Sequence, residues 1–466
     1  MKGINLNKKL ILFIIASIVS LGLIILVFTI KFTNPYKPSF YSYSAYADAA
    51  TMRDINKSYT YKEYATAKDF EYAFENNKAI AGVTSDYSII SLINNGKIAP
   101  IRKQVQEINK LENPWESYWS ETSVEQMNSY NNFITKETQE KLNVEYPEYK
   151  EEANGNNYVF KFSDFVVPYF INDRVIAIDT KKVLGKINIT DINNEFKFDT
   201  IHPTLVEALQ KIDKEASNDI KIQWTKNERE NVSMGSTKND PKNQWSTKID
   251  ENNYEELLNN FVFMVEEGTK AKISDVKKNL FDSDSDIILN NLINPASKIN
   301  VAIIYNGDAL DAYYGHDNFK DIEDGDRVRI VRTKYTLRIL DCFVVSSSIN
   351  KKERYNLLKD FNKTLFNGMF FSIEDFEKNE NPFEIEGMMR IFDYVNYTPA
   401  AKNIDQYVYE NYFKDEEGKQ DEIARSIYKV STTNEKDGIY VKSLEPIKKD
   451  VLSKLALDFQ KKLNGY

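Results

Sequence analysis

Strand-like and helix-like segments alternate from residue 39 onward, and this alternation constrains the fold more than any other feature of the chain. Aromatic and small polar residues alternate over residues 40–46, which is the period of a strand, and a helical pattern follows at once. Further strands are predicted at 59–64 and 79–83, with helices at 68–76 and 87–95. This β-α-β-α-β order predicts an α/β fold with a parallel, doubly wound sheet.

Hydroxyl groups and aromatic rings occur where the first and third predicted strands end. The first strand ends in Tyr43, Ser44 and Tyr46, and the third is followed by Ser85 and Tyr87. Open α/β sheets bind ligands at the carboxyl ends of their strands, so we expect a binding site at this edge. Ser85 is also a favourable helix N-cap, and that structural role explains its presence equally well.

The alternating pattern restarts in the second part of the chain. Strands are predicted at 165–170, 174–178, 196–199, 300–306, 327–333 and 337–345, and the last third is predicted to be mainly helical. Two polar stretches, 104–156 and 225–250, are predicted as insertions, the second of them a long loop.

Asp341 stands inside an otherwise apolar predicted strand, where an unpaired carboxylate is costly to bury. Its partner is either a nearby cation, Arg338 or Lys334, or a cationic ligand, and the sequence leaves both open. An aromatic face attracts an ammonium group by about 0.5–2 kcal/mol. A hydrogen bond to a charged group contributes about 1.5–3 kcal/mol. Several tyrosines with one or two carboxylates therefore suit a small organic polycation.

Composition excludes several other kinds of site. The 466 residues carry a formal net charge of -9, which disfavours nucleic acid as a partner and is compatible with a cationic ligand or with simple solubility. Cys342 is the only cysteine, and His202 and His316 are the only histidines, so an intrachain disulfide and a Cys/His zinc site are excluded. Because no paired-acid spacing suggests a hydrolase, we predict that the chain is not an enzyme and uses no cofactor or metal.

An uncharged apolar run near the amino terminus, Leu10 to Ile30, is long enough to span a membrane. Three lysines precede it, which places the amino terminus in the cytoplasm. A cleaved signal peptide is the alternative, but no small-x-small cleavage site follows, and no cysteine ends the run for lipid attachment. We predict a cytoplasmic segment at 1–9, a single-pass anchor at 10–31 and a tether at 32–38, with the remainder on the extracellular face of the cell membrane.

Taken in order, the strand-end segments resemble the substrate-binding component of ABC-type spermidine/putrescine transporters. Residues 40–46 are similar to that family's first strand, with Tyr43 in place of a tryptophan and Ala45 in place of an acid. Later segments resemble the family's Pro-Ser-x-Tyr turn, Val-Pro-Tyr strand, Trp-Asn-Gly-Ser and Trp-x-Asp-Ser motifs and late Thr-Pro pair; they are residues 84–87, 167–169, 305–308, 339–342 and 397–399. The resemblance extends from residue 39 to about 400.

The resemblance implies a two-lobe, periplasmic-binding-protein-like fold of type II, with a hinge and two crossings between the lobes. The crossings are expected near 179–184 and 334–340. Lobe 1 is then predicted to comprise residues 39–180 and 341–397, and lobe 2 to comprise residues 181–340 and 398–466.

The resemblance also implies that a polyamine binds in the cleft between the lobes. The closed form would then dock on the permease subunits of an ABC importer that is driven by a cytoplasmic ATPase. The candidate ligand-binding residues are Tyr43, Ser44, Tyr46, Ser85, Tyr87, Asp199, Tyr305, Asp308, Asp341 and Tyr397.

Two departures from the family bear on the ligand. Ala45 removes a carboxylate, whereas Asp86 and Asp308 are acidic where the family usually is not. Two alternatives therefore remain: another small solute in the same scaffold, or a surface interaction protein without a small ligand.

Overall fold

The computed structural model describes residues 8–33, 36–186, 189–198, 200–238, 240, 244–316, 318–414 and 417–466. The strands are β1 Ser39–Tyr43, β2 Thr60–Tyr64, β3 Ala81–Ser85, β4 Val167–Asp179, β5 Ile222–Thr225, β6 Asn279–Asp282, β7 Val301–Tyr305, β8 Val328–Val331, β9 Tyr335–Val345, β10 Thr398–Pro399 and β11 Tyr440–Lys442. The α-helices are α1 Lys8–Thr33, α2 Ala49–Ser58, α3 Ala67–Glu75, α4 Asp86–Asn94, α5 Arg102–Asn109, α6 Glu121–Ser129, α7 Lys136–Glu145, α8 Thr180–Leu184, α9 Ile192–Phe196, α10 Leu205–Glu215, α11 Glu228–Ser233, α12 Tyr254–Thr269, α13 Ser285–Ile293, α14 Asn306–Tyr313, α15 Lys351–Asn362, α16 Ile373–Glu377, α17 Met388–Val395, α18 Lys402–Asn411, α19 Glu422–Tyr428 and α20 Lys449–Leu463. Short 3-10 helices are η1 Trp115–Tyr118, η2 Asn131–Phe133, η3 Pro147–Glu151, η4 Phe162–Asp164, η5 Met234–Thr237 and η6 Pro382–Glu384.

The strands form one continuous sheet in the order β2-β1-β3-β9-β4-β7-β5-β6, with β8 and β10 paired to β4 and β11 paired to β9. At one end β1 runs parallel to β2 and β3, and at the other β5 runs parallel to β6 and β7. The long strands β4 and β9 lie between these ends and run antiparallel to their neighbours in that order. The predicted parallel β-α-β-α-β unit is therefore confirmed for β1 to β3.

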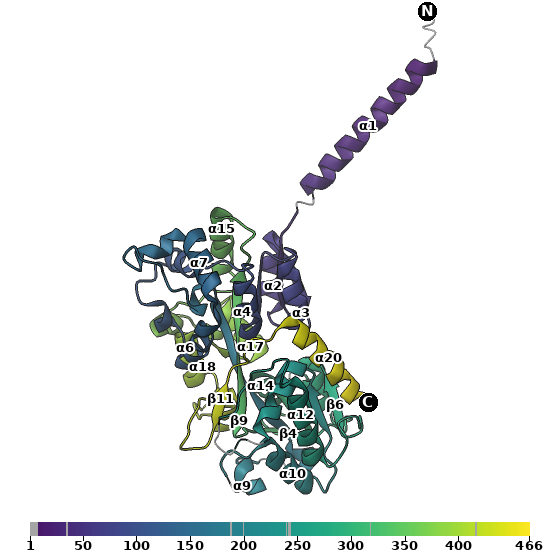
Figure 1. The fold of residues 1–466 in the computed structure, drawn as a ribbon, viewed down its shortest axis with the longest axis vertical. Helices are drawn as coiled ribbons and strands as arrows, with labels where there is room; N and C mark the ends of the chain where they lie inside the picture. Colours follow the sequence, from purple (N-terminus) through teal and green to yellow (C-terminus); the bar gives the residue numbers. More distant parts are fainter. Residues whose placement is uncertain are drawn as a thin grey trace, which may run out of the picture.

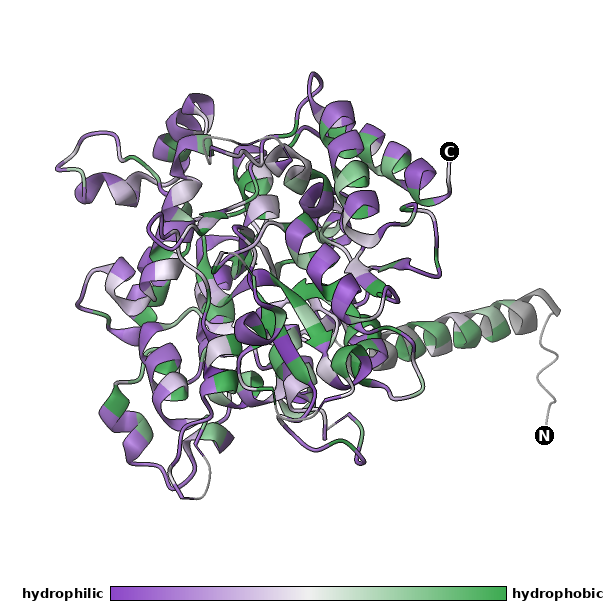
Figure 2. Ribbon diagram, turned by 90° about the horizontal axis from the view of Figure 1, so that it is seen from below, coloured by the Kyte–Doolittle hydropathy of each residue, from purple (hydrophilic) through white to green (hydrophobic). Residues whose placement is uncertain are grey.

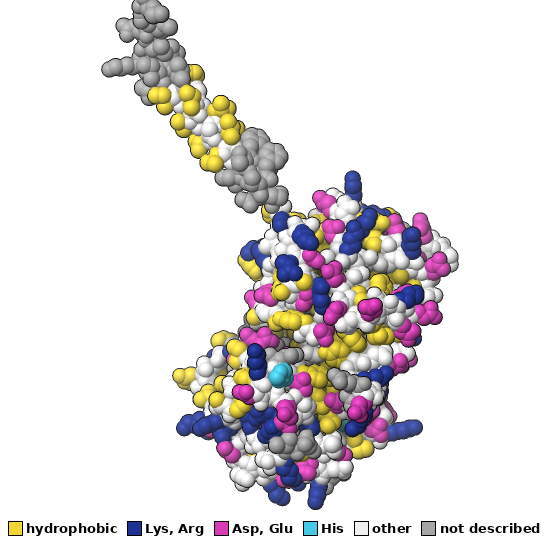
Figure 3. Space-filling model, turned by 180° about the vertical axis from the view of Figure 1, so that it is seen from behind, with side chains coloured by type: hydrophobic (Ala, Val, Ile, Leu, Met, Phe, Trp, Pro, Cys, Tyr) yellow, Lys and Arg dark blue, Asp and Glu magenta, His cyan; other side chains and the backbone are white. Residues whose placement is uncertain are grey.

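The chain gathers into two bodies around the two ends of the sheet (Figure 1). We call the body around β1, β2 and β3 lobe 1, and the body around β5, β6 and β7 lobe 2. Helices cover the sheet in both, and each has a buried apolar core, with Phe40 and Val83 in lobe 1 and Trp224 and Leu209 in lobe 2 fully buried. Figure 3 shows the waist between the lobes from behind, with hydrophobic side chains along it.

Strand β4 belongs to both lobes. Its residues 167–173 pair with β9, and its residues 174–178 pair with β7. The chain thus passes between the lobes at Asp173 and Arg174, earlier than the predicted 179–184. Strand β9 crosses at the predicted place, because residues 335–337 pair with β11 and residues from Arg338 onward pair with β4.

The late part of the chain divides differently from the predicted boundary at 398. Strand β10 pairs with Phe170 and Ile171 of β4, and α18 packs against η1 and α16, so residues 398–411 lie beside lobe 1. Helix α19 packs against α14 and β8, and α20 packs against α11 and α12, which places both beside lobe 2.

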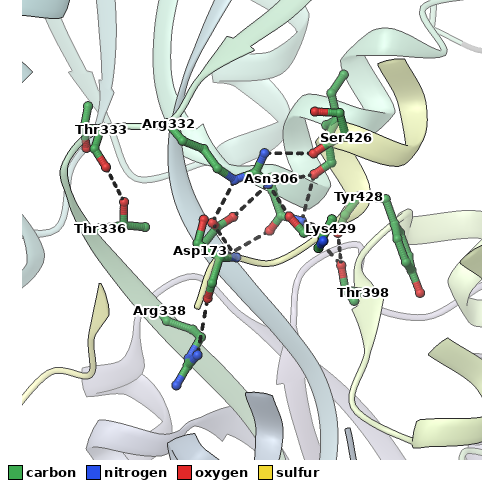
Figure 4. A network of polar contacts seen from close by, with 12 residues as sticks. Asp173, Asn306, Arg332, Thr333, Thr336, Arg338, Thr398, Ser426, Tyr428 and Lys429 are labelled. Carbon is green, nitrogen blue, oxygen red and sulfur yellow. Dashed lines mark hydrogen bonds and ion pairs between the residues drawn. The ribbon is translucent and has the colours of Figure 1, made fainter. Parts of the chain in front are cut away.

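A buried polar network holds the β4 crossing in place (Figure 4). Asp173 is fully buried, accepts from Arg332 Nε at 3.1 Å and accepts from the backbone N–H of Ser431 at 3.0 Å. The Asn306 side chain accepts from the Asp173 backbone N–H at 2.9 Å and donates to the Tyr428 carbonyl at 3.0 Å. These bonds tie the segment after α19 to the crossing, and they satisfy the polar groups that would otherwise interrupt a strand.

Two predicted strands at 165–170 and 174–178 are in fact one strand, β4. The two predictions left out residues 171–173, but these residues stay in the ladder with β9. Asp173 is paired with Arg332 at 3.1 Å, so its burial within a strand is compensated.

The strand predicted at 196–199 is wrong at its start, because Phe196 ends helix α9. The side chain of Asp191 accepts from the backbone N–H groups of Asn193 and Asn194 and caps this helix. Lys197 follows in the left-handed region with φ of 52°, which stops the helix and precludes an extended start. Residue 199 lies outside the described residues.

The polar stretch 225–250, predicted as a loop, contains α11 and η5. The Asn227 side chain accepts from the Glu230 backbone N–H and caps α11. Residues Arg229, Glu230 and Asn231 are buried, so these polar side chains face the protein interior and not solvent. The other polar stretch, 104–156, forms the helices α5, α6 and α7.

Helix α1 projects away from both lobes in Figures 1 and 2. Its side chains are described at Phe13 and at residues 15–26, and all of these are exposed. Among the residues that the structure describes, there is no helix with the length and apolar character needed to cross a bilayer. The predicted anchor at 10–31 lies within α1 and is not supported as a membrane span, and residues 1–7 of the predicted preceding segment lie outside the described residues.

Candidate functional site

A cavity of ≈ 270 Å³ lies between the two lobes. The carboxyl ends of parallel strands reach it from both sides: Tyr43, Tyr64 and Ser85 from lobe 1, and Thr225 and Tyr305 from lobe 2. Because the parallel strands of each lobe end toward the other lobe, their terminal polar residues surround one space.

Most of the predicted site residues meet at this cavity. Those that line it are Tyr43, Ser44, Tyr46, Ser85, Tyr87, Tyr305, Asp308, Asp341 and Tyr397. Asp199, the remaining candidate, lies outside the described residues.

Asp341 is held in the cavity wall by hydroxyl groups. Tyr46 Oη donates to its Oδ2, and Ser85 Oγ donates to its Oδ1 at 2.7 Å. Tyr43 Oη lies 2.8 Å from Ser85 Oγ and extends the chain of hydroxyls. Burial raises the pKa of Asp341 to about 6, so the carboxyl group is mostly ionised at neutral pH.

The two protein cations that the sequence offered to Asp341 are engaged elsewhere. Arg338 makes an ion pair with Glu125 at 3.0 Å, and Lys334 Nζ lies 5.3 Å from the centre of the Tyr335 ring. Within the described part of the chain Asp341 therefore has hydroxyl partners and no ion-pair partner. A buried carboxylate in this state presents its remaining oxygen lone pairs to the cavity.

A second acid, Asp308, lies at the start of α14 in lobe 2. Tyr397 Oη donates to Asp308 Oδ1, and burial raises the pKa of Asp308 to about 7. The Tyr397 ring packs on Gly307, where an added Cβ would lie 2.0 Å from Tyr397 Cδ1. Glycine at 307 is therefore what lets the ring reach Asp308. Tyr46 contacts the same ring, with 5.3 Å between the ring centres.

Helix α11 supplies residues that the sequence did not suggest. Glu230 is buried and accepts from Asn227 Nδ2 at 2.5 Å, and burial raises its pKa. Arg229 is also buried, and its guanidinium lies 4.5 Å from the centre of the Tyr87 ring. The ring predicted to receive a ligand amine thus already carries a cation of the protein. The one available signal was Asn227 followed by Glu230, which fits a helix N-cap with an acid at N3.

Asn172 completes the cavity at the β4 crossing. Its side chain is 2% exposed and lines the cavity, and its Oδ1 has no hydrogen-bond partner within the described part of the chain. A buried amide oxygen without a partner is costly, so this atom is available to a donor on a bound molecule.

Contacts between the lobes close one side of the cleft. Lys68 of α3 pairs with Glu228 of α11 at 2.5 Å, and Lys449 of α20 pairs with Glu75 of α3. Leu452 of α20 lines the cavity behind these pairs. Both lobes thus contribute to the wall of the cavity, which stays partly open to solvent.

Acidic side chains outnumber basic ones along the cavity. The acids are Glu71, Glu228, Glu230, Asp284, Asp286, Asp308 and Asp341, and the bases are Lys68, Lys226 and Arg229. The balance favours a ligand that carries positive charge. Among the described residues, no group of three or more His, Cys, Asp or Glu side chains is arranged to hold a metal ion.

The profile of a family of hypothetical lipoproteins, the MG045 family, matches residues 5–453. The chain belongs to this family. The only cysteine of this MG045-family protein, Cys342, is fully buried in β9. No curated protein sequence matches the chain.

Two solved structures show the fold of this MG045-family protein. A Listeria monocytogenes protein assigned provisionally as a spermidine/putrescine ABC transporter has a TM-score of 0.51 and 15% identity, over 91% of this chain and 98% of that one. The acarbose-binding GacH receptor of Streptomyces glaucescens has a TM-score of 0.50 and 10% identity, over 92% of this chain and 93% of that one. The predicted periplasmic-binding-protein-like α/β fold is therefore confirmed. The two proteins are named for different solutes, so the fold does not identify the solute.

Proposed function

We propose that this protein is the solute-binding component of an ABC importer and captures a small amine-bearing solute between its lobes. The observation that carries this proposal is Asp341, a buried carboxylate that lines the cavity and, among the described residues, has hydroxyl partners and no ion-pair partner. A bound ammonium would supply the missing positive charge. Spermidine and putrescine are the first candidates, because their amines suit a carboxylate and their methylenes suit tyrosine rings.

The arrangement of the cavity supports recognition of an amine. Tyr43, Tyr46 and Tyr397 line the cavity together with Asp341 and Asp308. The Tyr46 ring packs edge to face against Tyr397 and against Tyr43, with 5.5 Å between the ring centres of Tyr43 and Tyr46. Each ring face contributes about 0.5–2 kcal/mol toward an ammonium group. A charge-assisted hydrogen bond to the carboxylate contributes about 1.5–3 kcal/mol.

Binding would act on the hinge at β4 and β9. A solute that touches both Asp341 of β9 and Asp308 of lobe 2 stabilises the closed form and not the open one, and only such a difference shifts the equilibrium. We propose that the closed form docks on the permease subunits, which a cytoplasmic ATPase drives. Attachment through the apolar segment near residues 10–31 would keep the protein close to its permease.

Titration of the full chain in detergent micelles with spermidine and putrescine tests this function. We expect heat of binding and a rise in the melting temperature with at least one amine. Folded protein that shows neither effect at millimolar amine would contradict the proposal.

A further inference from the structure

The cavity contains a positively charged side chain as well as acids, and this side chain is Arg229. It is 6% exposed and lines the cavity above the Tyr87 ring. Its Nη2 donates to the Glu445 carbonyl, and its Nε is buried without a partner. Among the described residues, the Glu445 carbonyl is therefore the one hydrogen-bond acceptor of the Arg229 guanidinium.

The acids next to Arg229 in the sequence are engaged with other groups. Glu228 pairs with Lys68 at 2.5 Å, and Glu230 accepts from Asn227 Nδ2 at 2.5 Å. Among the other buried arginines that the structure describes, Arg327 and Arg338 each pair with a carboxylate at 3.0 Å, whereas Arg174, Arg329 and Arg354, like Arg229, make no ion pair. Glu230 and Glu71 lie near enough to interact electrostatically with Arg229, but Arg229 makes no ion pair with the described carboxylates, so its buried charge is only partly compensated.

Arg229 and Asp341 form two separate poles of one cavity. Asp341 is held by Tyr46 and Ser85, and its pKa is set by burial and by these two hydroxyls, with no contribution from Arg229. Arg229 comes from α11 of lobe 2 and is joined on the cavity rim by Lys226, an exposed lysine of the same segment. A ligand that spans the cleft therefore meets a carboxylate at one end and a guanidinium at the other.

We propose that the solute is a zwitterion whose ammonium binds Asp341 and whose carboxylate binds Arg229. This inference rests on the proposed function and narrows it to one class of amines. A diamine that extends from Asp341 toward Arg229, and not toward Asp308, would place its second ammonium against the guanidinium, where like charges repel. A carboxylate at that end would accept hydrogen bonds from the free guanidinium N–H groups in the planar geometry that arginine favours.

Matched ligands of equal length test the proposal. The full chain in detergent micelles is titrated with 4-aminobutanoate and putrescine, and then with 5-aminopentanoate and cadaverine. Within each pair one ammonium is exchanged for a carboxylate and the length stays similar. We expect each amino acid to bind at least tenfold more tightly than its diamine.

The variant Arg229→Gln separates ligand recognition from a role in holding the lobes together. We expect this variant to lower the affinity for the amino acids at least tenfold and to leave the affinity for the diamines unchanged or higher. Lys448→Gln, which removes a positive charge paired with Glu251 outside the cavity lining, is the control and should change neither class.

Three outcomes would overturn the inference. Diamines that bind as tightly as the amino acids would exclude the zwitterion and leave the proposed function intact. An equal loss of both classes in Arg229→Gln would show that Arg229 only joins the lobes. Binding of neither class by the folded protein would refute the proposed function together with the inference.

Discussion

The two walls of the cavity are built in different ways. The lobe 1 wall consists of strand ends, where Tyr43, Ser85 and Asp341 come from adjacent strands and are linked by hydroxyl groups. The lobe 2 wall depends on a short helix, α11, which carries Glu228, Arg229 and Glu230 with alternating charge. The strand ends of one wall thus present a single carboxylate, Asp341, on the sheet, and α11 on the other wall presents charges of both signs.

This difference assigns separate tasks to the two walls. Strands fix side chains by ladder hydrogen bonds, so the lobe 1 wall is suited to hold the charge that every ligand of the site must share. Short connecting segments tolerate substitution, so the lobe 2 wall is suited to select among ligands. Substitutions in the two walls should therefore have different consequences.

The largest effect is expected from Asp341→Asn. The substitution keeps the shape of the side chain and removes the charge that the ammonium requires, so amine affinity should fall at least tenfold. Isothermal titration measures the change.

Asp360→Asn is the matched control for Asp341→Asn. Asp360 also accepts a hydrogen bond from a tyrosine, Tyr59 Oη at 2.8 Å, but it is not part of the cavity lining. The Asp360→Asn substitution should leave amine affinity unchanged. If wild type and Asp341→Asn bound amines with equal affinity, Asp341 would not be part of the binding site, even though the fold is as described.

A second large effect is expected from Gly307→Ala, at the contact between the two walls. The added Cβ would overlap the Tyr397 ring, so the ring must move away from Asp308. Overpacking of this kind costs about 1–3 kcal/mol, and the free energy of unfolding in urea should fall by that amount.

Tyr397→Phe is the companion to Gly307→Ala, because it removes the hydroxyl that bonds Asp308 and keeps the ring. It should weaken amine binding and change stability less than Gly307→Ala. If Gly307→Ala were as stable as wild type, the ring would not be in the position described.

The strand-end candidates of both lobes, Tyr43, Ser85 and Asp341 as well as Tyr305, line the cavity, whereas the residues of helix α11 were not among the candidates, for a physical reason. Tyr43, Ser85 and Asp341 lie at the ends or within apolar strands, and the pleat and the parallel order of strands determine where they meet. Arg229 and Glu230 lie in a polar stretch whose period suggests a loop. The burial of Arg229 and Glu230 and the contact of Arg229 with Tyr87 show that this stretch faces inward, and neither feature is visible in one sequence.

The β4 crossing shows the same limit. Asn172, Asp173 and Arg174 interrupt the apolar pattern, and the sequence therefore predicted two strands in place of one. Their burial depends on partners distant in the chain, such as Arg332 for Asp173. Long-range pairing of this kind overrides the local pattern.

A moderate effect is expected from pH, through the lobe 1 wall. Burial raises the pKa of Asp341 to about 6, and protonation removes the charge that binds the amine. Amine affinity should fall as the pH is lowered from 7 to 5, by about tenfold for each unit well below the pKa. Titrations at several pH values measure this, with Asp341→Asn as the control that should show a smaller dependence.

Stability without solute should change with pH in the opposite direction. Because the pKa of Asp341 in the folded state exceeds the ordinary 3.8, the folded state binds more protons between about pH 4 and 6. Asp341 therefore lowers the free energy of unfolding as the pH rises through this window, and Asp341→Asn should lose that contribution. If the free energy of unfolding depended on pH identically in wild type and variant, folding would not raise the pKa of the Asp341 carboxyl group.

The smallest effect is expected where the lobes are joined at the edge of the lobe 2 wall, at the ion pair of Lys68 and Glu228. The side chain of Lys68 is 50% exposed, so the pair should contribute about 0–1 kcal/mol to closure. Lys68→Glu should weaken solute binding by a few-fold, and the exchanged pair Lys68→Glu with Glu228→Lys should restore it. Restoration would show that the pair acts on closure and not on the solute, since the exchange alters which charge each wall presents to the cavity. If the double variant bound no better than Lys68→Glu, then the charge of Glu228 would act on the ligand directly, and the division of tasks between the walls would extend to this residue as well.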